Sequence, residues 1–194
     1  MLTRNINLKN FKYSKNNKRI KKDLDLLLSE NNTVIQSLSP SYRNSYKNET
    51  IQKLKKNINF RIIGMGGSIL GTQSIYNFLK HKIKKNFQFI NNLKSNINFD
   101  KKKKYTNLIV SKSGNTLETI SNVNIVIKNQ EKNLFITENK KSYLFLLAEK
   151  LKSEIIHHNN FIGGRFSVLS EVGMLPAELM GLNIKKFKQI NNLI

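Results

Sequence analysis

Three short polar segments of this 194-residue chain carry the residue types that could bind an anion and stabilise negative charge. The first, Gly-Met-Gly-Gly-Ser from Gly64 to Ser68, has glycines that can bring backbone N–H groups against a phosphate. A dinucleotide-binding fingerprint needs glycine where Ile69 stands, and a nucleoside-triphosphate loop needs lysine where Thr72 stands. These departures disfavour NAD and ATP, and a simple tight turn stays open as the alternative.

The second segment, Ser-Lys-Ser-Gly-Asn-Thr from Ser111 to Thr116, places three hydroxyls and an ammonium before a helical pattern. Such groups suit a phosphomonoester, and we expect the hydroxyls at the surface edge of the fold. Glu118 lies three residues after Asn115, which is the spacing of a capping box, so we expect a helix cap there in preference to an acid or base. The alternative for the whole segment is a hydrophilic turn with an N-cap.

The third segment, Phe-Ile-Gly-Gly-Arg-Phe-Ser from Phe161 to Ser167, combines paired glycines with an arginine. The glycines let the backbone pass close to a ligand, and Arg165 can direct a fixed cation at a developing oxyanion. A surface salt bridge is the alternative for this arginine. His157 and His158 lie just upstream and belong to the residue type that titrates near neutrality, but the sequence shows no partner for them, so we leave them unassigned.

From residue 59 onward, short β-rich runs alternate with longer helical patterns, which is typical of βαβ units and a parallel sheet. We expect strands near 60–63, 87–90, 107–110, 133–136 and 154–156, and helical patterns at 72–82, 116–129, 142–152 and 167–181. Right-handed crossovers place helices on both faces, so the predicted fold is α/β: a doubly wound, five-stranded parallel sheet of flavodoxin-like topology. The three polar segments then follow strands one, three and five, at the edge where such sheets bind ligands.

The amino-terminal part is expected to be a helical extension of this sheet. Residues 1–19 lack apolar periodicity and predict a loosely packed arm without assigned structure. Helical spacing begins at Ile20 with Leu24, Leu27 and Leu28, and a second short pattern after Pro40 runs through residues 51 and 54. We therefore predict an arm and helices over 1–56, the sheet domain over 57–184 and the start of a linker over 185–194.

The chain carries 34 Lys and Arg against 12 Asp and Glu, a formal net charge of +22, which by itself suggests a nucleic-acid or membrane partner. A binding surface gathers its charge on one face with stacking aromatics between, whereas these lysines are scattered among Asn and Ile. The block from Lys101 to Lys104 predicts a solvated turn. We expect no specific nucleic-acid partner.

The chain has no cysteine, which excludes disulfides, thiolate metal sites and cysteine nucleophiles. The longest apolar run, 143–148, is far shorter than the roughly 20 residues that cross a bilayer. The amino terminus has no apolar stretch typical of a secretory signal. The prediction is a cytoplasmic protein without a membrane partner.

In order and spacing, the three segments resemble the glucose-6-phosphate isomerase family, and the third, extended from Gly163 to Ala177, is its most specific motif. The resemblance covers about residues 59–184 and implies the first sugar-isomerase domain of that family, which binds phosphosugars. It implies reversible aldose–ketose isomerisation of glucose 6-phosphate and fructose 6-phosphate, in glycolysis and gluconeogenesis. It also implies a cytoplasmic homodimer that uses neither a metal nor an organic cofactor.

The same resemblance assigns roles to single residues. Arg165 looks like the catalytic residue that stabilises the enediolate, in agreement with the principle that a preorganised cation at a developing oxyanion lowers the barrier. The groups that look like phosphate ligands are the hydroxyls of Ser111, Ser113 and Thr116, with the backbone of Lys112 beside them. The residues that look like sugar contacts are Gly67 and Ser68.

In the family, the base glutamate, a histidine and the ring-opening lysine belong to a second sugar-isomerase domain. That domain begins shortly after a segment like the one at 181–184, and this sequence ends at Ile194. We therefore expect an amino-terminal portion of an isomerase that is inactive alone, because general acid–base work contributes about 10² to 10⁴-fold. The alternative is a non-catalytic phosphosugar-binding module, which would not need an enediolate-stabilising arginine.

Overall fold

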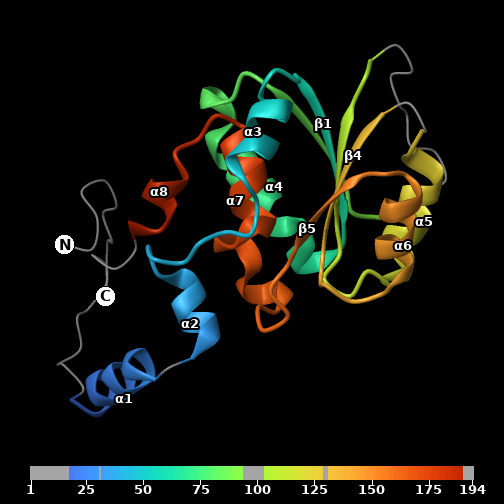
Figure 1. The fold of residues 1–194 in the computed structure, drawn as a ribbon. Helices are drawn as coiled ribbons and strands as arrows, with labels where there is room; N and C mark the ends of the chain where they lie inside the picture. Colours follow the sequence, from blue (N-terminus) through green and yellow to red (C-terminus); the bar gives the residue numbers. More distant parts are fainter. Residues whose placement is uncertain (1–17, 31, 94–102, 129–130, 190–194) are drawn as a thin grey trace.

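A single parallel sheet forms the centre of the molecule, with helices on both sides (Figure 1). The computed structural model describes residues 18–30, 32–93, 103–128 and 131–189. The strands are β1 (Asn59–Gly64), β2 (Asn86–Ile90), β3 (Thr106–Val110), β4 (Lys132–Thr137) and β5 (Glu154–His157). Their spatial order is β2-β1-β3-β4-β5 and every pair is parallel, which confirms the predicted doubly wound sheet of flavodoxin-like topology.

Helices cover both faces because the strand side chains alternate. On β1, Ile62 packs into one apolar cluster and its neighbour Ile63 into the other. Both residues are fully buried, as expected for a parallel strand covered on two sides. The covering helices are α5 (Leu117–Val126) and α6 (Tyr143–Lys150) on one face, and α3 (Asn48–Lys55), α4 (Leu70–Leu79) and α7 (Glu171–Leu179) on the other (Figure 1).

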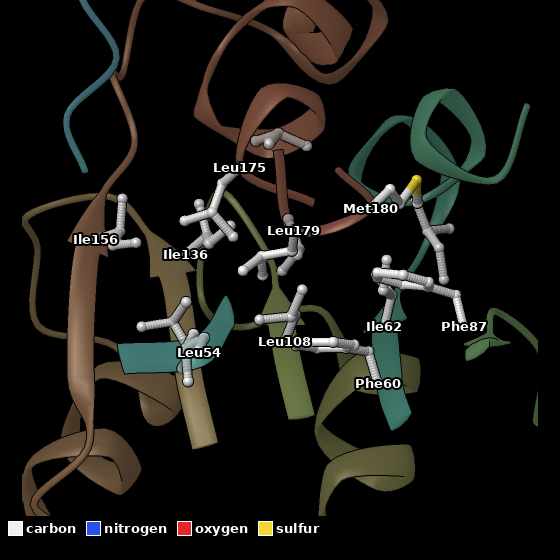
Figure 2. Packing of buried hydrophobic residues seen from close by; sticks show 14 of the residues in the cluster. Leu54, Phe60, Ile62, Phe87, Leu108, Ile136, Ile156, Leu175, Leu179 and Met180 are labelled. Atoms are coloured by element: carbon white, nitrogen blue, oxygen red, sulfur yellow. The ribbon is translucent and has the colours of Figure 1, made fainter. Parts of the chain in front are cut away.

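Helix α7 lies across the sheet on its larger apolar cluster. Figure 2 shows Leu175 and Leu179 facing strand side chains that include Ile62, Leu108 and Ile136. Leu175 has no exposed surface and Leu179 only 1%. This packing fixes the start of α7, and with it the end of the polar segment that precedes the helix.

The helix predicted at 167–181 is confirmed only in its second part. Residues Gly164–Leu169 form a short 3₁₀ helix (η3), and α7 begins at Glu171 because the Ser170 side chain accepts a hydrogen bond from the backbone N–H of Val172. Pro176 inside α7 has no N–H for the carbonyl of Val172. The hydroxyl of Thr72 on α4 donates to that carbonyl at 3.2 Å instead, which ties α4 to α7.

The other predicted elements lie close to their expected places. All five strands and the helical patterns at 72–82, 116–129 and 142–152 are confirmed; within the described residues α5 ends at Val126, and η2 (Lys80–Lys82) extends α4. The predicted helices of the amino-terminal part are α1 (Lys18–Ser29) and α3, and α1 has no buried residue. The sequence did not predict α2 (Thr33–Leu38), which Asn32 caps by accepting from the N–H of Val34.

Some predictions fall on parts of the chain that the structure does not describe. Residues 1–17 of the predicted arm and residues 101–102 of the lysine block lie outside the described residues. Lys103 and Lys104 are exposed. The domain limits near 56 and 184 stay predictions, and a short helix α8 (Ile184–Phe187) lies at the second of them. Among the described residues, every helix is too short or too polar to cross a bilayer.

Candidate phosphosugar site

The three polar segments leave the sheet at one edge, where the strands end. Gly64, the last residue of β1, pairs with Val110, the last residue of β3, so the first two segments start side by side. His157 ends β5 and pairs with Thr137 of β4. We call the segments the glycine loop (64–68), the hydroxyl loop (111–116) and the arginine loop (159–170).

In the glycine loop, the backbone geometry favours glycine at positions 66 and 67. Gly66 has a φ of +54°, a left-handed conformation that favours glycine. A β-carbon on Gly67 would meet the backbone of Gly164 in the arginine loop. Residues Gly66–Ser68 form a 3₁₀ turn (η1) that leads into α4, and Ser68 is half-buried. The backbone of the glycine loop is therefore a tight turn, as the alternative predicted. This turn lies at the edge of the sheet where a ligand would bind.

The hydroxyl loop brings two of its three hydroxyls together. The Oγ of Ser111 lies 3.1 Å from the Oγ1 of Thr116. Ser111 is only 2% exposed, so the expectation that all three hydroxyls lie at the surface is wrong for this residue, because its place directly after a central strand buries it. Ser113 is exposed, and its Oγ accepts from the N–H of Asn115 at 3.2 Å. Gly114 has a φ of +65°, which makes the turn.

The predicted capping box at the start of α5 is wrong. The N-cap of α5 is Thr116, without a side-chain capping hydrogen bond. Asn115 uses its Oδ1 to accept from the N–H of Tyr143 at 2.9 Å, so its side chain fastens the hydroxyl loop to the start of α6. Glu118 lies half-buried in the first turn of α5, where the helix dipole favours a carboxylate.

The arginine loop contacts both other loops. At one end, Nζ of Lys112 donates to the carbonyl of Asn160 at 2.5 Å. At the other, Oγ of Ser167 lies 3.2 Å from the carbonyl oxygen of Gly67 and 2.8 Å from that of Gly164. The structure thus brings the third segment that the sequence singled out against the glycine loop through Ser167, and the residue just before that segment, Asn160, against the hydroxyl loop.

Two cationic side chains, Arg165 and Lys112, belong to the loops at this edge. Arg165 is exposed, and among the described residues no ion pair joins it to an acidic side chain, so the surface salt bridge considered as the alternative is not found there. Lys112 lies 3.6 Å from a carboxylate oxygen of Glu138. An anion that enters between the loops would therefore meet one cation without an acidic partner.

The sequence leaves His158 unassigned and does not single out Glu171, its partner at the base of the arginine loop. His158 and Glu171 are buried, with 2.5 Å between Nδ1 and Oε1, whereas His157 is exposed. Burial alone raises the pKa of Glu171, but hydrogen bonds from His158, from its own backbone and from Tyr42, with the charge of His158, hold it below its ordinary value. The only signal in the sequence is that two ionisable residues flank the Gly-Gly-Arg segment.

A groove of about 680 Å³ lies beside the arginine loop, between the segment before α3 and the ends of β4 and β5. It is lined by Tyr42, Arg43, Ser45, Glu138, Asn139, Lys140, His157, His158, Asn159, Asn160 and Phe161. None of the substrate-binding residues predicted from the sequence is in this lining. Of the three loops, only the arginine loop contributes to this groove, through Asn159, Asn160 and Phe161, and Arg165 is not in the lining.

Comparison with known sequences identifies relatives of this chain. The sequence model of the family described as "Phosphoglucose isomerase" matches residues 13–192. Glucose-6-phosphate isomerase of Acholeplasma laidlawii (strain PG-8A) is 34% identical over an alignment of length 163, and the match covers 71% of this chain and 38% of that protein. The enzyme of the same name from Methanocaldococcus jannaschii is 38% identical over an alignment of length 140, and the match covers 66% of this chain and 34% of that protein. This chain thus spans about a third of the length of the curated relatives it matches.

Solved structures share the fold at low sequence identity. A hypothetical protein from Thermus thermophilus superposes with a TM-score of 0.64 and 21% identity, over 87% of this chain and 44% of that one. Tagatose-6-phosphate ketose/aldose isomerase from Escherichia coli gives 0.55 and 16%, over 90% and 47%. The Vibrio vulnificus NanR protein complexed with ManNAc-6P gives 0.52 and 17%, over 91% and 70%. These likenesses concern the fold alone.

Proposed function

The chain belongs to the phosphoglucose isomerase family, and from that premise we propose that its three loops bind glucose 6-phosphate or fructose 6-phosphate and form one half of an aldose–ketose isomerase site. The observation that carries the proposal is the meeting of the loops. The arginine loop contacts the hydroxyl loop through Lys112 and the glycine loop through Ser167. Hydroxyls suited to a phosphate and a cation suited to an oxyanion therefore share one edge of the sheet.

The residue roles within this proposal follow the chemistry of each group. Ser113 and Thr116 offer hydroxyls to the phosphate beside the start of α5, and the backbone of Lys112 lies next to them. Ser111 is buried against Thr116, so it orients that hydroxyl as well as binding. Gly67 and Ser68 contact the sugar from the neighbouring strand end.

Arg165 is the proposed catalytic residue of this half. Isomerisation moves a proton between two adjacent carbons and passes through an enediolate, whose oxyanion a preorganised guanidinium stabilises. Arg165 is exposed at the meeting point of the loops, next to Gly164, whose backbone touches Gly67. The base that removes the proton belongs, in this proposal, to a second sugar-isomerase domain.

Apolar side chains around the loops support a covering partner domain. Four large apolar side chains in or just after the three loops are exposed: Leu70 is 53%, Leu117 71%, Phe161 64% and Phe166 49% exposed. A second domain that packs on this edge of the sheet would cover such side chains. A homodimer and a cytoplasmic location, which the family resemblance implies, belong to the same proposal.

Calorimetry with the 194-residue chain tests the binding half of the proposal. We expect binding of fructose 6-phosphate and glucose 6-phosphate, and at least about tenfold weaker binding of glucose, because hydrogen bonds to a charged phosphate contribute about 1.5 to 3 kcal/mol each. Equal affinity for glucose and glucose 6-phosphate contradicts a phosphosugar site. Inorganic phosphate separates recognition of the phosphate from recognition of the sugar.

Complementation tests the catalytic half. The chain alone should show almost no turnover, and addition of a separately purified second sugar-isomerase domain from the Acholeplasma laidlawii relative should restore it. Ordinary enzymatic turnover by the chain alone would place a base within these residues, contrary to the proposal.

The second candidate is a phosphosugar-binding module without catalysis. The NanR protein, which shares the fold and was solved with ManNAc-6P, supports this candidate. Binding without restored turnover in the complementation experiment would favour it. Restored turnover that depends on Arg165 would exclude it.

A further inference from the structure

A buried carboxylate–imidazole pair closes the arginine loop at its base. His158 directly precedes the loop and Glu171 directly follows it, and the two are 4% and 0% exposed. Their side chains meet with 2.5 Å between Nδ1 and Oε1, although 13 positions separate them in the sequence. The contact therefore holds the two ends of the arginine loop together.

The second ring nitrogen of His158, Nε2, shows which ring atoms carry protons. Nε2 of His158 lies 2.9 Å from the carbonyl oxygen of Ile162, and a carbonyl can only accept, so Nε2 carries a hydrogen and donates it. One further proton then lies between Nδ1 and the carboxylate of Glu171. Such a charge-assisted hydrogen bond is stronger than a neutral one and fixes the ring orientation.

The carboxylate of Glu171 also collects donors from other segments. The hydroxyl of Tyr42, from the segment before α3, donates to Oε2 at 3.1 Å, and the N–H of Asn159 donates to Oε1 at 3.4 Å. Lys188 stacks over the Tyr42 ring at 4.5 Å and donates to the Tyr42 carbonyl at 3.3 Å. The pair thus joins the end of β5, the loop, the start of α7 and the amino-terminal segment.

The hydrogen bond from His158 to the carbonyl of Ile162 fixes the backbone three residues before Arg165. Ile162 is fully buried, and its carbonyl directly precedes the Gly-Gly-Arg segment. Gly164, Arg165 and Phe166 that follow are exposed. The side chains of Arg165 and Phe166 have little packing of their own, so their position depends on the fixed point before them, on the contact of Gly164 with Gly67 and on Ser167 after them.

We propose that the Glu171–His158 pair is a positioning pair, which holds the arginine loop against the glycine loop and thereby sets the place of Arg165. A buried pair of this kind is sensitive to loss of one partner, since the remaining group is left buried without compensation. The positioning role itself does not depend on any ligand, and its consequence for catalysis rests on the proposed function.

Hydrogen exchange in the ligand-free 194-residue chain tests the positioning role directly. Glu171→Gln and His158→Gln should speed the exchange of the Ile162 and Phe166 amides, which bond to carbonyls within the loop, by about tenfold or more. Tyr42→Phe, which removes one donor only, should give a smaller increase. Glu178→Gln is the matched control, because Glu178 lies on the same helix and accepts a hydrogen bond from Tyr46.

Amides of β3, such as that of Leu108, serve as the internal reference for global stability. A rise confined to the arginine loop supports the positioning role. Equal acceleration of the loop and of β3 would mean general destabilisation and would overturn the role, as would unchanged loop exchange in folded Glu171→Gln. Since Tyr42→Phe keeps the pair itself, it provides a graded comparison if the stronger variants fold poorly.

The complemented enzyme tests the consequence for catalysis by a double-mutant cycle. If Glu171 acts through Arg165, Glu171→Gln lowers kcat about tenfold with little change in KM when Arg165 is present. In the Arg165→Ala background, the same substitution should lower kcat much less. Additive losses overturn the action through Arg165. Failure of complementation counts against the proposed function alone, and the exchange experiment still decides whether the pair positions the loop.

Discussion

Gly67 and Gly164 approach so closely that a β-carbon on Gly67 would overlap the carbonyl group of Gly164. The two glycines follow β1 and β5, which are separated in the sheet by β3 and β4. The arginine loop therefore reaches back over two strand ends to touch the glycine loop, and the contact is backbone against backbone. A side chain at Gly67 would displace main chain and not merely another side chain, whereas a β-carbon on Gly164 would lie at an ordinary contact distance of 3.4 Å from the Cα of Gly67.

Gly67→Ala is therefore expected to lower the free energy of unfolding by about 1 to 3 kcal/mol, because the overlap can be relieved only by moving one of the loops. Gly163→Ala is the matched control. Its β-carbon would meet only a ring atom of Phe166 at 3.9 Å and its φ is −68°, so the change should stay within about 0.5 kcal/mol. Urea unfolding measures both, and equal losses would contradict the close approach.

Ser113→Ala should weaken fructose 6-phosphate binding about tenfold and change stability by less than about 0.5 kcal/mol, because its hydroxyl is exposed, accepts one N–H from Asn115 and keeps its own O–H for a phosphate. Ser111→Ala should also lower stability, by about 1 kcal/mol, because it leaves the hydroxyl of Thr116 without its buried partner. Calorimetry and urea unfolding separate the two effects. Ser29→Ala on α1 is the control, and a loss of stability in Ser113→Ala equal to that in Ser111→Ala would refute the distinction.

Arg165→Ala should leave stability unchanged, since the side chain is exposed and has no ion-pair partner among the described acidic residues. In the complemented enzyme it should lower kcat by about 10² to 10³ with little change in KM, because its contact is made chiefly with the enediolate. Arg43→Ala, an exposed arginine in the neighbouring groove, provides the comparison. A variant that raises KM and keeps kcat would assign Arg165 to ground-state binding.

Tyr46 makes the stability of the amino-terminal segment dependent on alkaline pH. Burial raises the pKa of Tyr46 above its ordinary value of 10.0, as do the charge of Glu178 and the hydrogen bond that Tyr46 donates to it. Because the pKa is higher in the folded state than in the unfolded chain, the contribution of Tyr46 to the free energy of unfolding is complete below pH 10.0 and declines as the pH rises above that value. Urea unfolding from about pH 8 to 11 should show a smaller alkaline loss for Tyr46→Phe than for the wild type, and no such relief for Tyr143→Phe, whose ring is exposed.

The sheet could be predicted because its central strands contain apolar residues buried on both faces, as Ile62 and Ile63 of β1 show. The loops could be predicted because parallel strands bring their carboxyl ends to one edge. The Glu171–His158 contact could not, because it forms only when the arginine loop returns to its own base. The capping box failed for a similar reason: Asn115 finds its partner on α6, outside the local pattern.

The place of α7 has a consequence for synthesis on the ribosome. The apolar face that it covers is built from strands made much earlier, since Phe60, Leu108 and Ile136 all precede it in the chain. Until Leu175 and Leu179 leave the exit tunnel, that face has no cover from α7 in the nascent chain. Chaperone binding to the nascent protein should therefore peak after β4 emerges and fall once α7 docks, and the arginine loop should gain its final shape in that same late step.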